Sequence, residues 1–161
     1  MRILALAAVL LAAAAPARAQ TPSTAPAREH AVTQHASGTF DVNIQPQATD
    51  APGLSRMSLD KQFHGDLEAT SKGEMLANGS ASGSGVYVAL EVVTGTLQGR
   101  SGSFALYHSG VMNRGTPTLS VNVVPDSGTG ELTGIAGSLR IIIEGGKHSY
   151  ELDYTLLDAG S

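Results

Sequence analysis

The sequence predicts an all-β fold, a single antiparallel closed β-barrel of about eight strands. From Ser37 onward, apolar and polar residues alternate with a period of two, and no window of about 11 residues after the N-terminal segment has a helical period. Glycine-containing turn sequences separate these segments at short intervals. A Gly-x-Leu pattern recurs from Gly65, Gly95 and Gly130, each time with the spacing of a β-hairpin. Closure removes exposed strand edges, which favours a barrel over a sandwich.

The N-terminus predicts export. An apolar stretch from Ile3 to Ala15 follows Arg2, and the small-x-small sequence Ala17-Arg18-Ala19 is typical of a signal-peptide cleavage site. We expect residues 1–19 to be a signal peptide, cleaved after Ala17 or Ala19, and the protein to be periplasmic or extracellular. A retained membrane anchor is the alternative, although the stretch is short for a span. Residues 20–36 are rich in Thr, Pro and Ala and are expected to form a disordered linker before a barrel domain at 37–158.

The strands follow from the alternation and the turn residues. The first is expected around Phe40 to Ile44 and the second around Met57 to Phe63. Further strands are expected at 71–77, 85–98, 101–113, 117–124, 129–134, 137–144 and 148–157, with turns at 78–79, 114–115, 125–128 and 145–146. The first strand is expected to close the barrel by pairing with the last, at Tyr150 to Leu156.

The central hairpin contains the main candidate for chemistry. A two-residue turn of the Gly-first type at Gly99-Arg100 would place Glu91 opposite His108 on one face, among apolar side chains. If that face lines a cavity, the carboxylate and the imidazole form a pair suited to proton transfer. The alternative is a structural pair that satisfies its own hydrogen bonds. The opposite row of the hairpin is also apolar, so the sequence leaves open which face is inside.

Other side chains on the presumed inner rows are candidates to bind a ligand. They are Tyr87, Val93, Phe104, Leu106, Tyr150, Tyr154 and Lys61. Tyr150 and Tyr154 combine an apolar ring with a polar end, whereas Lys61 continues an apolar row and is expected at the mouth of the barrel. Small residues on these rows are expected to leave room for a ligand: Ala89, Gly95, Gly102 and Gly110.

Composition excludes several functions. The formal net charge is −4 and Lys and Arg are not clustered, which argues against nucleic acid or an anionic membrane surface as a partner. No pair of histidines has a metal-binding spacing, so no metal is expected. No nucleophile elbow or dinucleotide-binding loop occurs, and no cofactor is expected. Cysteine is absent, so an exported domain must be stabilised by its core and its hydrogen bonds alone.

Several segments together resemble a known family. They are Met57-Ser-Leu-Asp-Lys-Gln-Phe-His-Gly-Asp-Leu67, Ser71-Lys-Gly-Glu-Met75, Gly95-Thr-Leu-Gln-Gly-Arg-Ser-Gly-Ser-Phe104, His108-Ser-Gly110 and Val124-Pro-Asp-Ser-Gly-Thr-Gly-Glu-Leu132. They resemble a bacterial family of uncharacterised proteins, a domain of unknown function with an allene-oxide-cyclase-like barrel. The stretch from Gly128 to Gly137 also looks like the glycine-rich region of allene oxide cyclases and plant dirigent proteins. The resemblance covers about Ser37 to Leu156 and implies an eight-stranded barrel with a central cavity, but no catalytic residue carries over.

These observations lead to three hypotheses for function. The first is a module that binds a small, largely apolar molecule inside the barrel. The second is a cofactor-free isomerase or cyclase, with Glu91 as general base or charge stabiliser and His108 as its partner. The third is a structural barrel whose apolar outer rows form a homo-oligomer.

Overall fold

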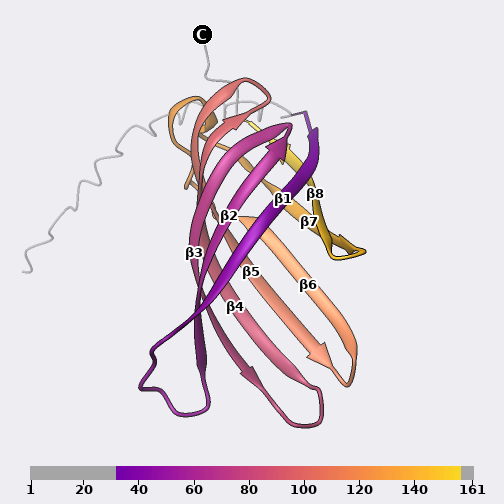
Figure 1. Ribbon diagram of the computed structural model, residues 1–161. Coiled ribbons are helices and arrows are strands. Elements are labelled where there is room, and N and C mark those ends of the chain that lie inside the picture. Colours follow the sequence, from indigo (N-terminus) through magenta and orange to yellow (C-terminus); the bar gives the residue numbers. More distant parts are fainter. Residues whose placement is uncertain (1–31, 157–161) are drawn as a thin grey trace, which may run out of the picture.

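The protein folds into a closed antiparallel barrel of eight strands in sequential order, as the sequence predicted (Figure 1). The computed structural model describes residues 32–156, so the predicted signal peptide and most of the predicted linker lie outside it. The strands are β1 (Gln34–Gln47), β2 (Ser55–Gly65), β3 (Leu67–Gly79), β4 (Gly85–Leu97), β5 (Arg100–Asn113), β6 (Thr116–Val123), β7 (Ala136–Glu144) and β8 (Lys147–Thr155). A short 3₁₀ helix, η1 (Gly130–Leu132), precedes β7. No helix within residues 32–156 is long and apolar enough to cross a membrane.

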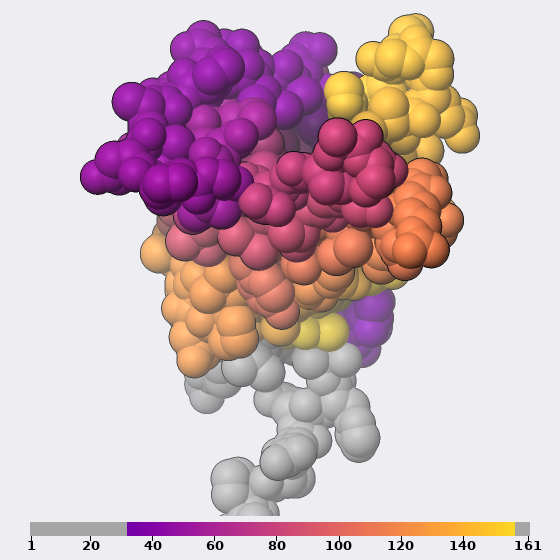
Figure 2. All heavy atoms as spheres, turned by 90° about the horizontal axis from the view of Figure 1, so that it is seen from below, coloured from indigo at the N-terminus to yellow at the C-terminus, as the bar shows by residue number. Residues whose placement is uncertain are grey.

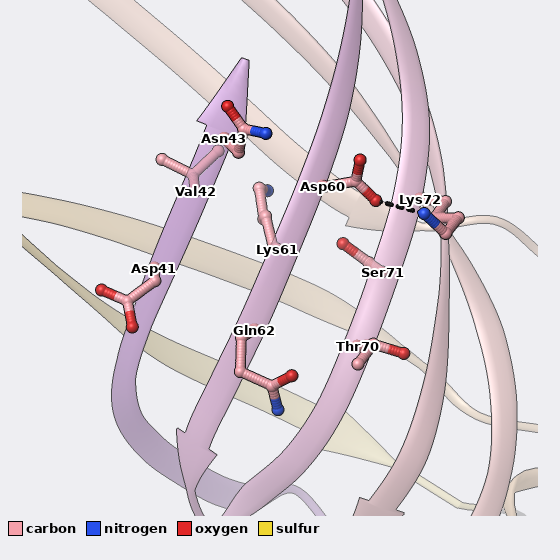
Figure 3. Close-up of a pocket in the computed structure, with 9 residues that line it drawn as sticks. All are labelled: Asp41, Val42, Asn43, Asp60, Lys61, Gln62, Thr70, Ser71 and Lys72. Carbon is pink, nitrogen blue, oxygen red and sulfur yellow. Dashed lines mark hydrogen bonds and ion pairs between the residues drawn. The ribbon is translucent and has the colours of Figure 1, made fainter. Parts of the chain in front are cut away.

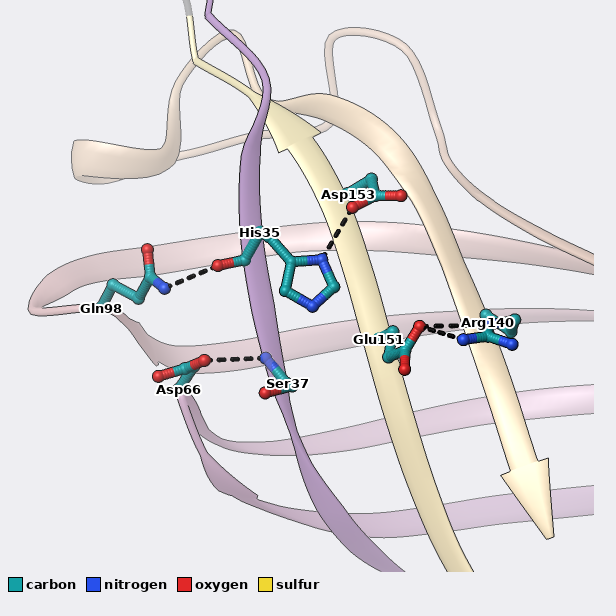
Figure 4. A network of polar contacts seen from close by, with 7 residues as sticks. All are labelled: His35, Ser37, Asp66, Gln98, Arg140, Glu151 and Asp153. Atoms are coloured by element: carbon teal, nitrogen blue, oxygen red, sulfur yellow. Dashed lines mark hydrogen bonds and ion pairs between the residues drawn. The ribbon is translucent and has the colours of Figure 1, made fainter.

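Pairing between the first and last strands closes the barrel, also as predicted, but it uses the other half of β1. Residues 34–40 pair with 154–148, whereas the sequence placed the pairing at Phe40 to Ile44. Strand β1 therefore begins at Gln34, three residues inside the predicted linker. Across this seam His35 Nδ1 is 2.8 Å from Asp153 Oδ1, and the hydrogen bond to Asp153 raises the pKa of His35 (Figure 4). Gln98 Nε2 donates to the His35 carbonyl at 2.9 Å, which ties the β4–β5 turn to the same seam.

Only one of the three repeated patterns forms the predicted hairpin. The second surrounds the β4–β5 turn. In the first pattern no hairpin turn forms, because Gly73 lies in the middle of β3, within the strand predicted at 71–77. A Cβ at Gly73 would meet Glu91 Cβ at 2.6 Å, so glycine serves strand packing there. The third contains η1 instead of the strand predicted at 129–134, because Gly130 has a φ of +59° and the chain turns there.

One end of the barrel is filled with packed side chains. The largest of these are Tyr150, Tyr154, Phe63 and Phe104, each at most 1 % exposed. Leu132 of the η1 segment packs onto the same cluster and covers this end. Two of the small residues that were expected to leave room for a ligand, Gly95 and Gly102, leave none at this end. A Cβ at Gly95 would lie 2.2 Å from the Glu68 carbonyl oxygen, and a Cβ at Gly102 would lie 2.1 Å from the Thr129 carbonyl oxygen. The predicted space is thus occupied by neighbouring backbone.

The barrel is least regular between β6 and β7. Every other neighbouring pair of strands has at least seven residues in register, but β6 and β7 share the single pair Asn122 and Ser138. Strand β6 diverges from β7 beyond this point (Figure 1). A groove of about 290 Å³ follows the divergence and includes Leu119 and Ile141 among its lining residues. The same two residues line the interior, so the seam adjoins the inside of the barrel.

Candidate functional site

The β4–β5 hairpin brings Glu91 and His108 together, although its register differs from the predicted one. The turn is Gln98-Gly99, with φ of +46° and +84°, not Gly99-Arg100. Each predicted partner is therefore displaced by two residues: Glu91 lies opposite Leu106, and Ala89 lies opposite His108. A displacement of two residues keeps every side chain on its predicted face, because strand faces alternate with a period of two. The two side chains then meet diagonally, with His108 Nε2 2.9 Å from Glu91 Oε1.

Glu91 is the centre of a buried polar network built from four strands. Lys61 Nζ, from β2, donates to Glu91 Oε1 at 2.7 Å. Ser71 Oγ, from β3, donates to the other carboxylate oxygen at 2.6 Å. With His108 from β5, three donors converge on one carboxylate whose side chain is fully buried. The network is complete in this sense: no fully buried side-chain nitrogen or oxygen among residues 32–156 lacks a partner.

The donors around Glu91 keep it ionised. Burial alone would raise the pKa of this carboxyl group, but the hydrogen bond from His108, the charge and hydrogen bond of Lys61, and the hydrogen bond from Ser71 together lower its pKa to about 2. A carboxylate so stabilised is a weak base. Of the two roles suggested for Glu91 by the sequence, this environment therefore suits a stabilising charge and not a general base.

His108 presents a basic nitrogen to the interior. Because ionised Glu91 accepts a hydrogen bond, Nε2 of His108 is the donor, and the neutral ring has its lone pair on Nδ1. Nδ1 has no hydrogen-bond partner among residues 32–156, and no fully buried side-chain nitrogen there is left unpaired. This nitrogen is therefore accessible to solvent from the cavity that His108 lines.

A cavity of about 290 Å³ lies between this network and the open end of the barrel. Figure 2 views the molecule from that end, where the turns β1–β2, β3–β4, β5–β6 and β7–β8 lie. Lys61, His108, His148 and Tyr87 are its polar or partly polar lining residues, and the rest are apolar: Phe40, Val42, Ile44, Leu59, Met75, Leu119, Ile141 and Ile143. A neighbouring hollow of about 390 Å³ shares Met75, Tyr87 and Leu119 with it. The inner rows thus form an apolar pocket with a cationic and a basic group at its inner end.

The predicted ligand-binding residues separate into two groups. Tyr87 and Lys61 line the cavity, and Lys61 is only 8 % exposed, so it lies deeper than the mouth position expected for it. The other five are at most 1 % exposed and belong to the packed core at the filled end: Val93, Phe104, Leu106, Tyr150 and Tyr154. The structure thus places these five in the filled half of the barrel and not beside the cavity.

Sequence reasoning missed several residues of the site. Ser71 was not singled out, although it lies on the same inner row of β3 as the cavity residue Met75. His148 and Ile143 were also missed. Alternation alone could have placed these residues on the inner face. Their position along the barrel depends on the register of distant strands, which alternation does not encode.

A larger hollow of about 430 Å³ lies over β1, β2 and β3 and is lined mainly by polar side chains (Figure 3). Asp60 and Lys72 form an ion pair across it at 2.6 Å. The side chains of Asp41 and Lys72 are 92 % and 86 % exposed, so water screens their charges. The buried network, in contrast, operates in a low-dielectric interior, which makes it the stronger candidate for a site.

The comparisons with known proteins agree with this fold. No curated protein matches the chain. A crystal structure of a protein of unknown function from the DUF3224 family of Shewanella oneidensis MR-1 is 47 % identical, covers 80 % of this chain and 100 % of its own, and has a TM-score of 0.75. Residues 36–154, nearly the whole barrel, match the family described as "Protein of unknown function (DUF3224)". The chain therefore belongs to the DUF3224 family.

Proposed function

We propose that this barrel is exported and binds a small molecule with an apolar body and an oxygen-bearing head group. The observation that carries the proposal is the apolar cavity at the open end, with Lys61 and His108 at its inner end. Barrels of eight strands either fill with side chains or hold one small ligand, and half of this one is hollow. Ligand pockets commonly enclose about 300–1,000 Å³, a range that the cavity and the hollow beside it approach.

The polar groups specify the head group. The ammonium of Lys61 has three hydrogens, of which one is used by Glu91, so it can donate to a ligand oxygen. Nδ1 of His108 can accept a hydrogen bond from a hydroxyl or a protonated carboxyl group. A cationic head would be repelled by Lys61 and find no free carboxylate oxygen, because Glu91 is already bound by three donors. We therefore expect octanol and octanoate to bind and octylammonium to be rejected.

A tryptophan reporter tests this proposal, because the native chain has no tryptophan. Ile143→Trp places the reporter at the cavity mouth, and Asn43→Trp on the outer face of β1 is a matched control, since both native residues are exposed. We expect octanol and octanoate to change the emission of the first variant only. An unchanged Ile143→Trp spectrum, or an equal response of the control, would contradict binding in the barrel.

The accessible nitrogen of His108 favours a second candidate function, a cofactor-free isomerase or cyclase. In this alternative His108 Nδ1 takes a proton from the substrate, Lys61 stabilises the negative oxygen that forms, and Glu91 holds the imidazole in place. The two functions differ in whether a bound compound leaves chemically changed. His108→Gln would abolish conversion in an enzyme, whereas octanol would still bind, more weakly, through Lys61 and the apolar lining. Calorimetry and mass analysis of the recovered compound would distinguish the two functions.

A further inference from the structure

The outer surface of the barrel is divided by charge. The outward rows of β1–β3 include Arg56, Asp60 and Lys72, and those of β7 and β8 include Arg140 and Glu151. The outward rows of β4, β5 and β6 contain no Asp, Glu, Lys or Arg at all. Depletion of charged residues distinguishes the centre of a protein interface from the rest of a surface.

The same uncharged surface is apolar along β4, its edge next to β3. Alternate residues of β4 are aliphatic, and each is about half exposed: Val86, Val88, Leu90 and Val92. On β5, Tyr107 lies beside Leu90 and Val111 lies beside Val86. On β3, Leu76 lies beside Val88. These seven residues form a continuous apolar patch, which we call the β4 patch. Scattered exposed aliphatic residues are ordinary on a protein surface, but a contiguous patch indicates a binding surface.

We infer that the β4 patch is the interface of a two-fold homodimer, in which the outer faces of β4–β6 from two copies pack against each other. An uncharged face offers no electrostatic complement to a charged partner, whereas it complements a second copy of itself. Two sheets packed face to face through alternating aliphatic residues form an arrangement common in β-sandwiches.

The area of the face is sufficient for a dimer. Strands β4, β5 and β6 have 13, 14 and 8 residues. At about 3.3 Å per residue and about 4.8 Å between strands, they present a sheet face of about 550 Å². Two such faces bury about 1,100 Å² in total, above the roughly 1,000 Å² that a specific interface should exceed. The dimer is independent of the proposed ligand, because the β4 patch faces away from the barrel cavity.

Sedimentation velocity at micromolar concentration tests the inference, with Leu90→Lys as the disrupting variant. Leu90 is outward-facing and 55 % exposed, so lysine there is compatible with the monomer fold. We expect the wild type to sediment as two chains and Leu90→Lys to raise the dissociation constant roughly 100-fold or more. Each copy would bring an ammonium into the apolar interface, and the single carboxylate beside it, Glu74, does not offset the cost of desolvating that charge. Asn43→Lys, on an exposed outward position of β1, is the matched control and should remain dimeric.

Single-cysteine variants test the symmetry, because the native chain has no cysteine. Val88→Cys or Leu90→Cys, near the two-fold axis, should form a disulfide-linked dimer on mild oxidation, whereas Asn43→Cys should not. A monomeric wild type, or an assembly that Leu90→Lys leaves intact, would overturn the inference. So would an assembly of another size, or a monomer that floats with phosphatidylcholine vesicles through the same patch.

Discussion

At the residue scale, Glu91 shows how a buried charge is made tolerable. An isolated carboxylate at this depth would be neutralised by desolvation, but donors from three other strands surround it. Buried ion pairs contribute little when compared with an apolar core, yet removing one partner leaves the other uncompensated. The buried charge of Lys61 is therefore compensated by Glu91, just as the buried charge of Glu91 is compensated by Lys61.

The lowered pKa of Glu91 predicts a specific pH dependence of stability. Folding lowers its pKa from 4.5 to about 2, so the ionised carboxylate stabilises the folded state above pH 4.5, and this contribution is lost as pH falls through 2. The difference corresponds to about 3 kcal/mol. We expect Glu91→Gln to be less stable than the wild type at pH 7, and the gap to close as pH falls from about 4.5 towards 2, as measured by urea unfolding.

Glu74→Gln serves as the control for this measurement, because Glu74 is half exposed and forms a surface ion pair with Arg56. Such pairs contribute less than about 1 kcal/mol. A gap between wild type and Glu91→Gln that stays constant from pH 7 to pH 2.5 would contradict the stabilising role assigned to the ionised carboxylate.

At the scale of elements, the β4–β5 turn sets the register on which the site depends. Its first residue, Gln98, has a positive φ without being glycine. Long-range hydrogen bonds hold it there: the Gln98 backbone N–H donates to the Asp66 carbonyl oxygen at 2.7 Å, and its side chain accepts from Tyr154 at 2.8 Å. The second residue, Gly99, has a φ of +84° and open space around it.

Alanine substitution separates conformation from packing at this turn. Gly99→Ala introduces no clash but forces an L-residue into the left-handed region, so we expect a loss of about 1–2 kcal/mol in the free energy of unfolding. Gly79→Ala at the end of β3 is the control, because its φ is not positive and the nearest atom would be 3.9 Å from the new Cβ. Equal midpoints of urea unfolding for the two variants would show that the turn does not require glycine.

At the scale of the whole molecule, the barrel divides into a stabilising half and an open half. The covered end contains the aromatic core and the η1 segment, whereas inward residues at the other end are exposed to the cavity. The packed core and the cavity thus occupy different ends of one set of strands. The single registered pair between β6 and β7 adds an unpaired edge beside the open half.

This division predicts unequal costs for similar truncations. Leu106→Ala removes a fully buried side chain from the filled half, so we expect a loss of about 2–5 kcal/mol. Ile143→Ala, at a position 64 % exposed on the cavity rim, should cost less than about 1 kcal/mol. Thermal or urea unfolding of the two variants checks the difference, and similar losses would indicate that the open half is as tightly packed as the other.

The sequence by itself determined the strand alternation, the all-β class, the closure by first and last strands and the shared face of Glu91 and His108. These properties follow from local periodicity, which fixes the face of a side chain even when the register is displaced by two residues. Only the tertiary structure decided the register itself, because contacts from Asp66, His35 and Tyr154 select a turn that begins at Gln98 and not at Gly99. The tertiary structure also decided which end of the barrel is hollow and that Lys61 forms an ion pair with Glu91. Both depend on how distant strands are staggered around a closed barrel.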